Sequence, residues 1–564
     1  MPQPVAFNTG SSISGSIQSS RISYAIETSG SDYRAGYAGK NWYSELPATT
    51  GVVFIKDTTA IGRGNPGNPA FWITNGTSSA AILATANGLP GSPRNFATTE
   101  SAYSWSLANG FFINDPNEPF NQIDTDSLAL YLDASKTVSY PTTASTWYDI
   151  SGNNDNGSLI NGPTYNSIGA IVFDGIDDRG DISNIVNIGN PNTVTAIVKL
   201  NGLQSGSSGA GSPGTSVYGP TANGADNWLG FSGSKVNLFG TELNDINNFE
   251  LNSISSLDTS NTRWYSVTST ISGSIATIYL NGIQDNTVTK SFTIGSWNSS
   301  ANIGSRGANQ RLFKGSISSI QAYNKALTQT EILQNYYQAP IVTNGLVFAV
   351  DAGNLVSYES GSTITYSLTG SATGSLFNGT SFSNTKGGVW SFDGADDFIQ
   401  INNNASINSI YTNNQLTISS WFRYGDSGSF RNVMGILRNG DPTFLAFGWR
   451  IGSANSFFFD SSINNTRITQ QLIADISPYT SSYINAVTTY TNGSMLSYVN
   501  GVLVNSGNFT GSISDFTSSN FLIGASAGYG VFKGNIAPTF LYNRALTATE
   551  IQQNFNAQRN RFNI

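Results

Sequence analysis

Two short acidic segments are the residues of this chain best suited to bind a metal ion. The first, FDGIDD, contains Asp174, Asp177 and Asp178, and the second, FDGADD, contains Asp393, Asp396 and Asp397. Carboxylate oxygens are the ligands that Ca²⁺ prefers, so either segment could supply part of a calcium site. The alternative is structural, because aspartates beside a turn glycine accept hydrogen bonds from backbone amides. The oxygen-rich loop DISGNND at residues 149–155 is open to the same two interpretations. We expect no other cofactor.

Four aromatic residues beside Gly- and Asn-rich segments are candidates for sugar binding: Trp228, Trp297, Trp449 and Tyr529. A flat ring can stack on the apolar face of a pyranose while neighbouring amides bind the sugar hydroxyls. Most tryptophans are largely buried. We therefore expect one or two of the four to be exposed, and the sequence does not indicate which.

The chain contains no histidine and no cysteine. A Ser-His-Asp triad, a Cys-His pair and the usual His- or Cys-ligated zinc sites are therefore excluded. Carboxylate, Tyr, Lys or Ser-Lys chemistry remains. Without cysteine the chain has no disulfides, and it is indifferent to the redox state of its compartment.

The last two-thirds of the chain contains one set of segments twice. FKGSISSIQAYNKALTQTEI at residues 313–332 corresponds to FKGNIAPTFLYNRALTATEI at residues 532–551, and IYLNG at 278–282 corresponds to SYVNG at 497–501. Each pair is separated by 219 residues (532 − 313 and 497 − 278), and so are Asp174 and Asp393 of the acidic segments. This spacing is far longer than the roughly 20–50 residues of solenoid or propeller repeats. The chain therefore carries two copies of one globular domain.

Helix and hairpin signals also recur in both copies. Thr328 with Glu331, and Thr547 with Glu550, are spaced as capping boxes, which predicts short helices over residues 328–337 and 547–556. Asn-Gly pairs at 281–282 and 500–501 lie between β-rich runs, which predicts tight hairpins.

The remaining motifs resemble those of a known family. They are LYLDAS (130–135) and VFDGIDD (172–178) in the first copy, and FAVDAG (348–353), SFDGADDFIQI (391–401) and LTISSWFRY (416–424) in the second. Together they resemble the concanavalin A-like, laminin-G-type jelly roll, the lectin/glucanase sandwich. The resemblance implies a mainly β fold with two tandem jelly-roll β-sandwiches, at residues 126–340 and 341–564. The first copy departs from the family pattern at TVTAIVKL (193–200), which lacks the tryptophan that the second copy keeps as Trp421.

The resemblance also bears on catalysis. Laminarinase-type jelly rolls carry an E-x-D-x-x-E pattern, because glycoside hydrolysis needs two closely spaced carboxyl groups. This chain has no such pattern, and Glu331 and Glu550 are already assigned to helix caps. We expect no enzymatic activity, so a polysaccharide depolymerase is the least favoured function.

Residues 1–125 form a separate N-terminal module with an expected α+β fold. We predict a strand over 52–58 and helices over 77–88 and 98–110. Residues 1–120 resemble a small module near the start of structural proteins of large tailed phages. The polar, alternating stretch at residues 5–26 is either an arm that docks on a neighbouring subunit or an ordinary strand of its own module. We expect a homo-oligomer.

Composition limits the partners. Charged residues make up 11% of the chain and the net charge is −8. No basic stripe is available for nucleic acid, and no apolar stretch is long enough to span a membrane. The N-terminus also lacks the pattern of a signal peptide. We expect a non-enzymatic protein on the surface of a virion or extracellular particle, in its head or tail, held by other structural proteins and binding surface glycans. The alternative is a purely structural particle protein whose jelly rolls contact neighbouring subunits.

Overall fold

The structure of the chain is a computed structural model that describes most of residues 123–564 and five short strands before them. Within residues 123–564 it leaves out 143, 184–187, 205–213, 221–226, 241–248, 291–299, 308–309, 371, 426–429, 442–443, 453–454, 526–529 and 563. Among the described residues, no helix is long and apolar enough to cross a membrane.

The described parts of the N-terminal module are strands. β1 (Phe54–Asp57) pairs with β5 (Phe111–Asn114), and β2 (Phe71–Ile73), β3 (Ala80–Ala84) and β4 (Arg94–Phe96) form a second small sheet. β1 lies inside the predicted strand 52–58. The prediction of a helix over 77–88 is wrong for Ala80–Ala84, because pairing with a strand on each side outweighs a weak local helix preference. The helix predicted over 98–110 lies outside the described residues.

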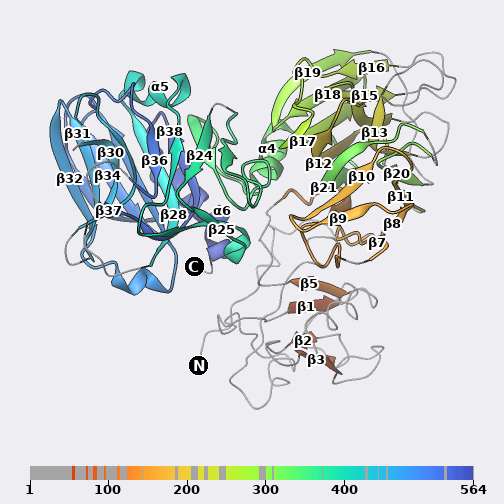
Figure 1. Cartoon of the computed structure of the whole chain (residues 1–564), viewed down its shortest axis with the longest axis horizontal. Coiled ribbons are helices and arrows are strands. Elements are labelled where there is room, and N and C mark those ends of the chain that lie inside the picture. Colours follow the sequence, from red (N-terminus) through yellow and green to blue (C-terminus); the bar gives the residue numbers. More distant parts are fainter. Residues whose placement is uncertain are drawn as a thin grey trace. The chain divides into compact units, whose positions relative to one another are not determined.

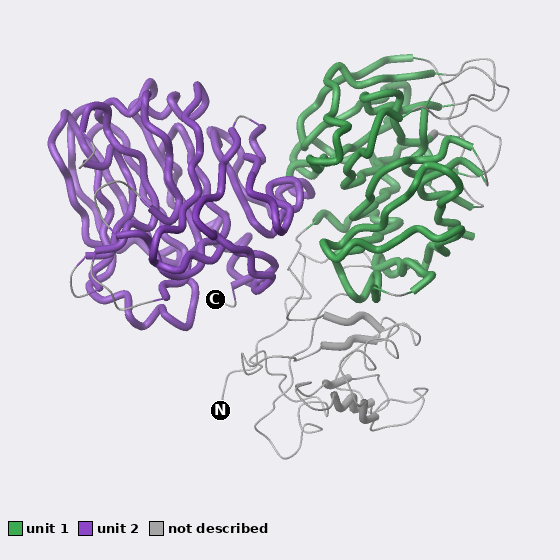
Figure 2. Tube along the Cα trace, viewed as in Figure 1, with its two compact units in different colours: residues 1–118, 123–333 green, residues 119–122, 334–564 purple. Residues whose placement is uncertain are grey.

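The chain divides into two compact units, residues 1–118 with 123–333 and residues 119–122 with 334–564 (Figure 2). Each unit contains one β-sandwich made of two sheets, which we call the back sheet and the front sheet (Figure 1). This confirms the predicted pair of concanavalin A-like sandwiches. The predicted division into three domains at residues 125 and 340 stays a prediction.

The back sheet of the first sandwich consists of β6 (Leu128–Asp133), β9 (Thr164–Asn166), β10 (Ala170–Asp174), β12 (Asn192–Asn201), β17 (Ser260–Ser272), β18 (Ile275–Leu280), β19 (Ile283–Thr289) and β21 (Lys314–Tyr323). Their order is β19-β18-β17-β12-β21-β10-β9, and β6 also pairs with β21. The front sheet consists of β7 (Thr146–Trp147), β8 (Gly157–Ile160), β11 (Arg179–Ile182), β13 (Thr215–Pro220), β14 (Asn227–Ser232), β15 (Lys235–Gly240), β16 (Phe249–Asn252) and β20 (Ala301–Ile303). Their order is β16-β15-β14-β13-β20-β11-β8-β7.

The second sandwich repeats this arrangement. Its back sheet consists of β22 (Leu346–Val350), β25 (Ser381–Ser383), β26 (Val389–Asp393), β28 (Leu416–Tyr424), β33 (Ile484–Thr491), β34 (Ser494–Val499), β35 (Val502–Gly507) and β38 (Lys533–Tyr542). Its front sheet consists of β23 (Ile364–Tyr366), β24 (Thr373–Phe377), β27 (Phe398–Ile401), β29 (Arg431–Leu437), β30 (Leu445–Ile451), β31 (Phe457–Ile463), β32 (Thr466–Ile473), β36 (Phe521–Ile523) and β37 (Gly530–Val531).

The strand orders of the two sandwiches correspond one to one. The second back sheet runs β35-β34-β33-β28-β38-β26-β25 with β22 on β38, and the second front sheet runs β32-β31-β30-β29-β36-β27-β24-β23. The short strand β37, which pairs in parallel with β29, is an addition of the second copy. The predicted equivalence of the two copies is therefore confirmed at the level of topology.

Alternation along the strands builds the core of each sandwich. In β12, Val194, Ala196 and Val198 point inward and are fully buried, as are Leu229 and Phe231 of the facing sheet. Side chains alternate between the faces of a strand, so one face of each sheet is apolar and its other face is free to vary. Burying one such aliphatic or aromatic side chain contributes about 1.5–3 kcal/mol.

The predicted capping boxes are present. α4 (Gln329–Tyr337) begins after Thr328, whose backbone N–H donates to Glu331 Oε2 at 2.7 Å. α6 (Ala548–Phe562) begins after Thr547, whose backbone N–H donates to Glu550 Oε2 at 2.8 Å. The second helix is longer than predicted. The second copy also has α5 (Ala405–Asn413) and the 3₁₀ turns η1 (Thr385–Gly387) and η3 (Ser477–Thr480).

Both predicted Asn-Gly hairpins are also present. Asn281 and Gly282 have φ of 50° and 77°, and Asn500 and Gly501 have φ of 51° and 77°. These positive values suit the two-residue turns that join β18 to β19 and β34 to β35.

Candidate functional site

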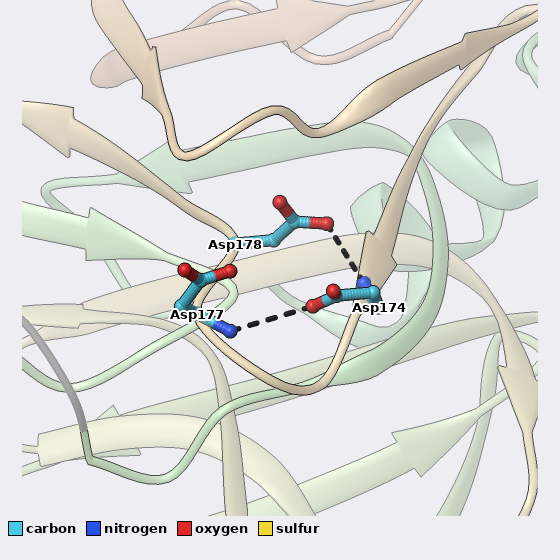
Figure 3. Close-up of side chains that lie close together, drawn as sticks. All are labelled: Asp174, Asp177 and Asp178. Atoms are coloured by element: carbon cyan, nitrogen blue, oxygen red, sulfur yellow. Dashed lines mark hydrogen bonds between the residues drawn. The ribbon is translucent and has the colours of Figure 1, made fainter.

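The first acidic turn, residues 174–178, joins β10 of the back sheet to β11 of the front sheet (Figure 3). Asp174 Oδ1 accepts the backbone N–H of Ile176 at 2.7 Å, and Asp178 Oδ2 accepts that of Asp174 at 2.9 Å. Gly175 has φ of 77°, which a residue with a side chain rarely adopts. The structural interpretation of these aspartates therefore holds, because their carboxylates fix the turn.

The second acidic turn, residues 393–397, has the same bonds between β26 and β27. Asp393 Oδ1 accepts the N–H of Ala395 at 2.7 Å, and Asp397 Oδ2 accepts that of Asp393 at 2.9 Å. In each turn, one carboxylate oxygen from each of the three aspartates lies within 4.8 Å of the others. Making the turn and binding a cation are compatible, since each carboxylate has a second oxygen.

The two turns differ at one oxygen. Asp397 Oδ1 is buried without a hydrogen-bond partner, and Asp397 is only 3% exposed. Burial raises the pKa of Asp397, the Asp393 amide lowers it in part, and the charges of Asp393 and Asp396 raise it further. Burial likewise raises the pKa of Asp178. A buried carboxylate oxygen without a partner is costly, so Asp397 is the more strained of the two buried aspartates.

The loop at 149–155 is a structural element instead. Asp149 accepts hydrogen bonds from the backbone N–H groups of Tyr131, Ser151 and Asp155 at 2.9, 2.8 and 3.1 Å. The Ser151 hydroxyl adds a fourth at 2.7 Å. In the second copy, Ser367 Oγ accepts the N–H of Ala349 at 3.2 Å in the same place. Both Asp149 oxygens are therefore used in holding the loop to β6.

Two of the four aromatic candidates, Trp228 and Trp449, lie among the described residues, and both are buried. Trp449 is fully buried in the second core, and its Nε1–H donates to Thr488 Oγ1 at 3.3 Å. Trp228 lies on the outward face of the first front sheet but is only 1% exposed. Neither of these two rings is therefore exposed for stacking on a sugar. Trp297 and Tyr529 lie outside the described residues, and the prediction continues to rest on them.

Trp228 is covered by cations and by a second ring. The Phe239 ring stacks on it with centroids 4.5 Å apart. The guanidinium carbons of Arg306 and Arg311 lie 4.4 and 4.9 Å from the centroid of its ring. Burial lowers the pKa of Arg311, and the charge of Arg306 lowers it further. The Trp228 ring holds two arginines on this face instead of stacking on a ligand.

A polar cluster lies beside Phe239 on this outward face. Asn237 Nδ2 donates to Glu250 Oε1 at 2.8 Å and to Asn252 Oδ1 at 3.0 Å, and Asn252 Nδ2 donates to Glu250 Oε1 at 3.2 Å. Glu250 is exposed and Phe239 is half-buried. We call Asn237, Phe239, Glu250 and Asn252 the front-face cluster. In the sequence, its polar residues Asn237, Glu250 and Asn252 stand next to the apolar Val236, Leu238 and Leu251. A search restricted to exposed tryptophans does not find this pattern.

The second front sheet carries different groups at the corresponding positions. Asp460 is 4% exposed and forms ion pairs with Arg450 and Arg467 at 2.6 and 2.5 Å. The guanidinium carbon of Arg450 lies 4.5 Å from the centroid of the Phe458 ring. Strand registers place Asp460 where the first copy has Phe239. The outward faces of the two front sheets are therefore chemically distinct.

Comparison with known proteins establishes the family. Residues 174–333 and 393–552 each match the profile of the concanavalin A-like lectin/glucanases superfamily. The chain therefore belongs to this superfamily. No curated protein matches it.

Several solved structures are similar to parts of the chain. Domain 4 of the extracellular arabinanase AbnA from Geobacillus stearothermophilus is 17% identical, with 38% of this chain and 98% of that chain covered and a TM-score of 0.30. The mouse laminin alpha1 chain domains LG4-5 are 12% identical, with 68% and 93% covered and a TM-score of 0.22. The binding domain of botulinum neurotoxin serotype D is 12% identical, with 71% and 97% covered and a TM-score of 0.33.

Proposed function

We propose that this chain is a non-enzymatic surface protein of a virion or similar extracellular particle, and that its sandwiches bind surface glycans. The front-face cluster carries the glycan part of the proposal. Its exposed Glu250 carboxylate and the partly exposed Asn252 amide can bind sugar hydroxyls, while the half-buried Phe239 ring can pack against the apolar face of a sugar. The superfamily supports this, because its name includes lectins.

The absence of catalytic residue types supports a binding role over an enzymatic one. The sequence has neither histidine nor cysteine and lacks the E-x-D-x-x-E pattern. Glu331 and Glu550 are engaged at the N-termini of α4 and α6, where each bonds a threonine N–H and a basic side chain. We expect the purified protein to release no reducing ends from algal or bacterial polysaccharides.

Attachment to a particle is assigned to the N-terminal module. Its support is the resemblance of residues 1–120 to a module of phage structural proteins. Two sandwiches in one chain, and many chains on one particle, would raise the effective concentration of weak sugar sites. The proposed function is therefore weak, multivalent adhesion.

The glycan proposal is tested by glycan-array binding of the full-length protein and its Glu250→Ala variant. We expect the substitution to weaken binding about tenfold, since hydrogen bonds to a charged group contribute about 1.5–3 kcal/mol. Gln284→Ala is the control, because Gln284 is exposed on β19 of the same sandwich and outside the front-face cluster. Equal binding by all three proteins would show that the front-face cluster is not the glycan site, and no binding by any of them would favour the purely structural role.

The particle proposal has a separate test. Purified particles are labelled with gold-conjugated antibodies against the sandwiches and viewed by electron microscopy. We expect labels on the outer surface of intact particles. Labelling only after the particles are broken would place the sandwiches inside and contradict surface display.

A further inference from the structure

Part of the second front sheet presents outward side chains that carry no charge. Ile399 and Ile401 of β27 and Ile523 of β36 are fully buried in the core. Side chains alternate between the two faces of a strand, so the residues between these core positions point outward. With their partners on β23 and β24, we call the outward residues the uncharged patch: Ile364, Ser375, Phe377, Phe398, Gln400 and Leu522.

Two phenylalanine rings form the apolar part of this patch. Phe377 and Phe398 lie opposite each other on β24 and β27, and their rings stack with centroids 4.8 Å and planes 15° apart. Phe377 is 37% exposed, and Phe398 is half-buried. Covering apolar surface contributes about 25 cal/mol per Å². The stacked pair therefore offers aromatic surface that a ligand with an apolar face can cover.

Two polar side chains lie beside the rings on the same strands. Ser375 and Gln400 also lie opposite each other, two residues from Phe377 and Phe398, which is about 7 Å along a strand. Ser375 is exposed and Gln400 is half-buried. Within the described parts of the chain, neither side chain forms a hydrogen bond. A hydroxyl and an amide can both donate and accept, so the two groups are available to the hydroxyls of a ligand.

The first sandwich has charged and engaged groups at the corresponding positions. Its registers place Ile160 opposite Arg179, and Ser158 opposite Asp181. Arg179 Nε donates to Asp181 Oδ1 at 3.0 Å, and Asn302 Nδ2 donates to the same oxygen at 2.8 Å. The polar groups there bond one another and no pair of rings is present at these positions. The uncharged patch is therefore a feature of the second sandwich.

We propose that the uncharged patch is a second glycan site and that its ligand is an uncharged glycan. Phe377 and Phe398 pack against the apolar face of a sugar ring, and Ser375 and Gln400 bond its hydroxyls. A patch without charge gives an acidic glycan no electrostatic advantage. A protein partner fits it less well, because a stable protein interface involves about 20–30 residues on each side. The inference rests on the proposed glycan binding, but it assigns the second sandwich a site and a ligand class of its own.

The test is binding of the full-length protein to an array of uncharged glucans, mannans, galactans and xylans, with sulfated and uronate-containing glycans for comparison. We expect binding to uncharged members, and we expect Phe377→Ala to weaken it about tenfold because a ring is lost. Gln400→Ala, which leaves both rings in place, should weaken it about threefold. Ile160→Ala, the matched substitution in the first sandwich, should bind as the wild type does. Far-ultraviolet circular dichroism confirms that each variant is folded.

The Glu250→Ala variant separates this inference from the proposed function. Binding to the glycans that Phe377→Ala weakens should be unchanged in Glu250→Ala, because Glu250 lies in the other sandwich. If Glu250→Ala weakens binding while Phe377→Ala and Gln400→Ala do not, glycan binding stands and the second site is refuted. Binding of no glycan by the wild type would refute both.

Sedimentation velocity tests the competing occupant, a second copy of the chain. We expect the wild type and Phe377→Ala to have the same oligomeric state. Dissociation of an oligomer by Phe377→Ala, with glycan binding unchanged, would make the patch a protein interface and overturn the proposal. A Phe377-dependent preference for sulfated or uronate-containing glycans would overturn the assigned ligand class.

Discussion

Apart from the added β37, the two sandwiches share the strand order of both sheets, but they differ in what covers the back sheet. In the first, Ile197 of β12 is half-exposed on the outward face. In the second, the equivalent Trp421 of β28 is fully buried, stacked on Phe555 and Phe562 of α6 with centroids 5.7 and 4.4 Å apart. The longer C-terminal helix therefore gives the second copy a small outer core of its own. The inward faces are kept alike by packing, and the outward faces are where the copies diverge.

An ion pair reinforces the longer helix. Arg561 donates to both carboxylate oxygens of Asp351 at 2.6 and 2.9 Å, and to the carbonyl oxygens of Lys386 and Gly388. Asp133 holds the equivalent place in the first copy and accepts instead from Tyr131 Oη and Ser135. The same aspartate thus closes a local turn in one copy and anchors a helix in the other.

The largest expected difference between the copies comes from removing the ring under α6. We expect Trp421→Ala to lower the free energy of unfolding of the second sandwich by about 3–5 kcal/mol, because it empties a buried site. Ile197→Ala in the first should cost about 1 kcal/mol, since that side chain is already half-exposed. Denaturant unfolding followed by far-ultraviolet circular dichroism measures both. Similar losses of unfolding free energy in the two variants would show that packing against α6 contributes little to the stability of the second sandwich.

The ion pair gives the next largest effect. We expect Arg561→Met to cost about 3 kcal/mol, because it leaves Asp351 buried without its cation. The double variant Arg561→Met with Asp351→Asn should recover part of that loss. Guanidinium unfolding curves of the two variants give the comparison. Without any recovery, Asp351 would not be the group through which Arg561 acts.

The capping boxes predict a pH-dependent effect in both copies. The hydrogen bond from Arg544 lowers the pKa of Glu550 to about 2. Burial by itself would raise the pKa of Glu331, but the hydrogen bonds from Lys325 and Thr328 and the charge of Lys325 together outweigh burial, so the pKa of Glu331 is also lowered. A carboxyl with a lowered folded-state pKa stabilises above its unfolded value, near 4.3, and loses that effect as the pH falls.

We therefore expect Glu550→Gln to cost about 1 kcal/mol at pH 7 and almost nothing near pH 2. Glu331→Gln should behave alike in the first copy. Thermal unfolding at pH 7, 4 and 2 measures both. A constant cost across this range would show that the carboxylate charge is unimportant at the caps.

The smallest difference is expected at the acidic turns. Gly175 and Gly394 have φ of 77° and 85°, and a Cβ atom on either would lie 2.8 Å from the Cβ of Lys314 or Lys533. We expect Gly175→Ala and Gly394→Ala to cost about 1–3 kcal/mol each, from backbone strain and this contact. Measured without calcium, the two losses should agree within about 0.5 kcal/mol. A larger gap would show that the two turns differ in backbone conformation.

Local signals in the sequence were sufficient for the repeated elements. The capping boxes at Thr328 and Thr547, and the Asn-Gly hairpins, depend on residues close in the chain, so spacing alone identified them. The segment at Ala80–Ala84 was misassigned because pairing with β2 and β4 decided its conformation. The length of α6 also exceeded the prediction, since its last turns are held by Trp421 and Asp351, which lie far away in the sequence.

What the sequence determined by itself is therefore the duplicated β-sandwich, the turns that join its strands and the absence of histidine and cysteine chemistry. Only the tertiary structure decided how the candidate site residues are used. Trp228 and Trp449 have similar glycine-rich surroundings in the sequence, yet one ring lies among arginines and the other in a core. Asp178 and Asp397 stand in nearly identical motifs, yet of these two only Asp397 has a buried carboxylate oxygen without a hydrogen-bond partner. Burial and the partners of a polar group depend on contacts between distant strands, and a local motif carries no record of them.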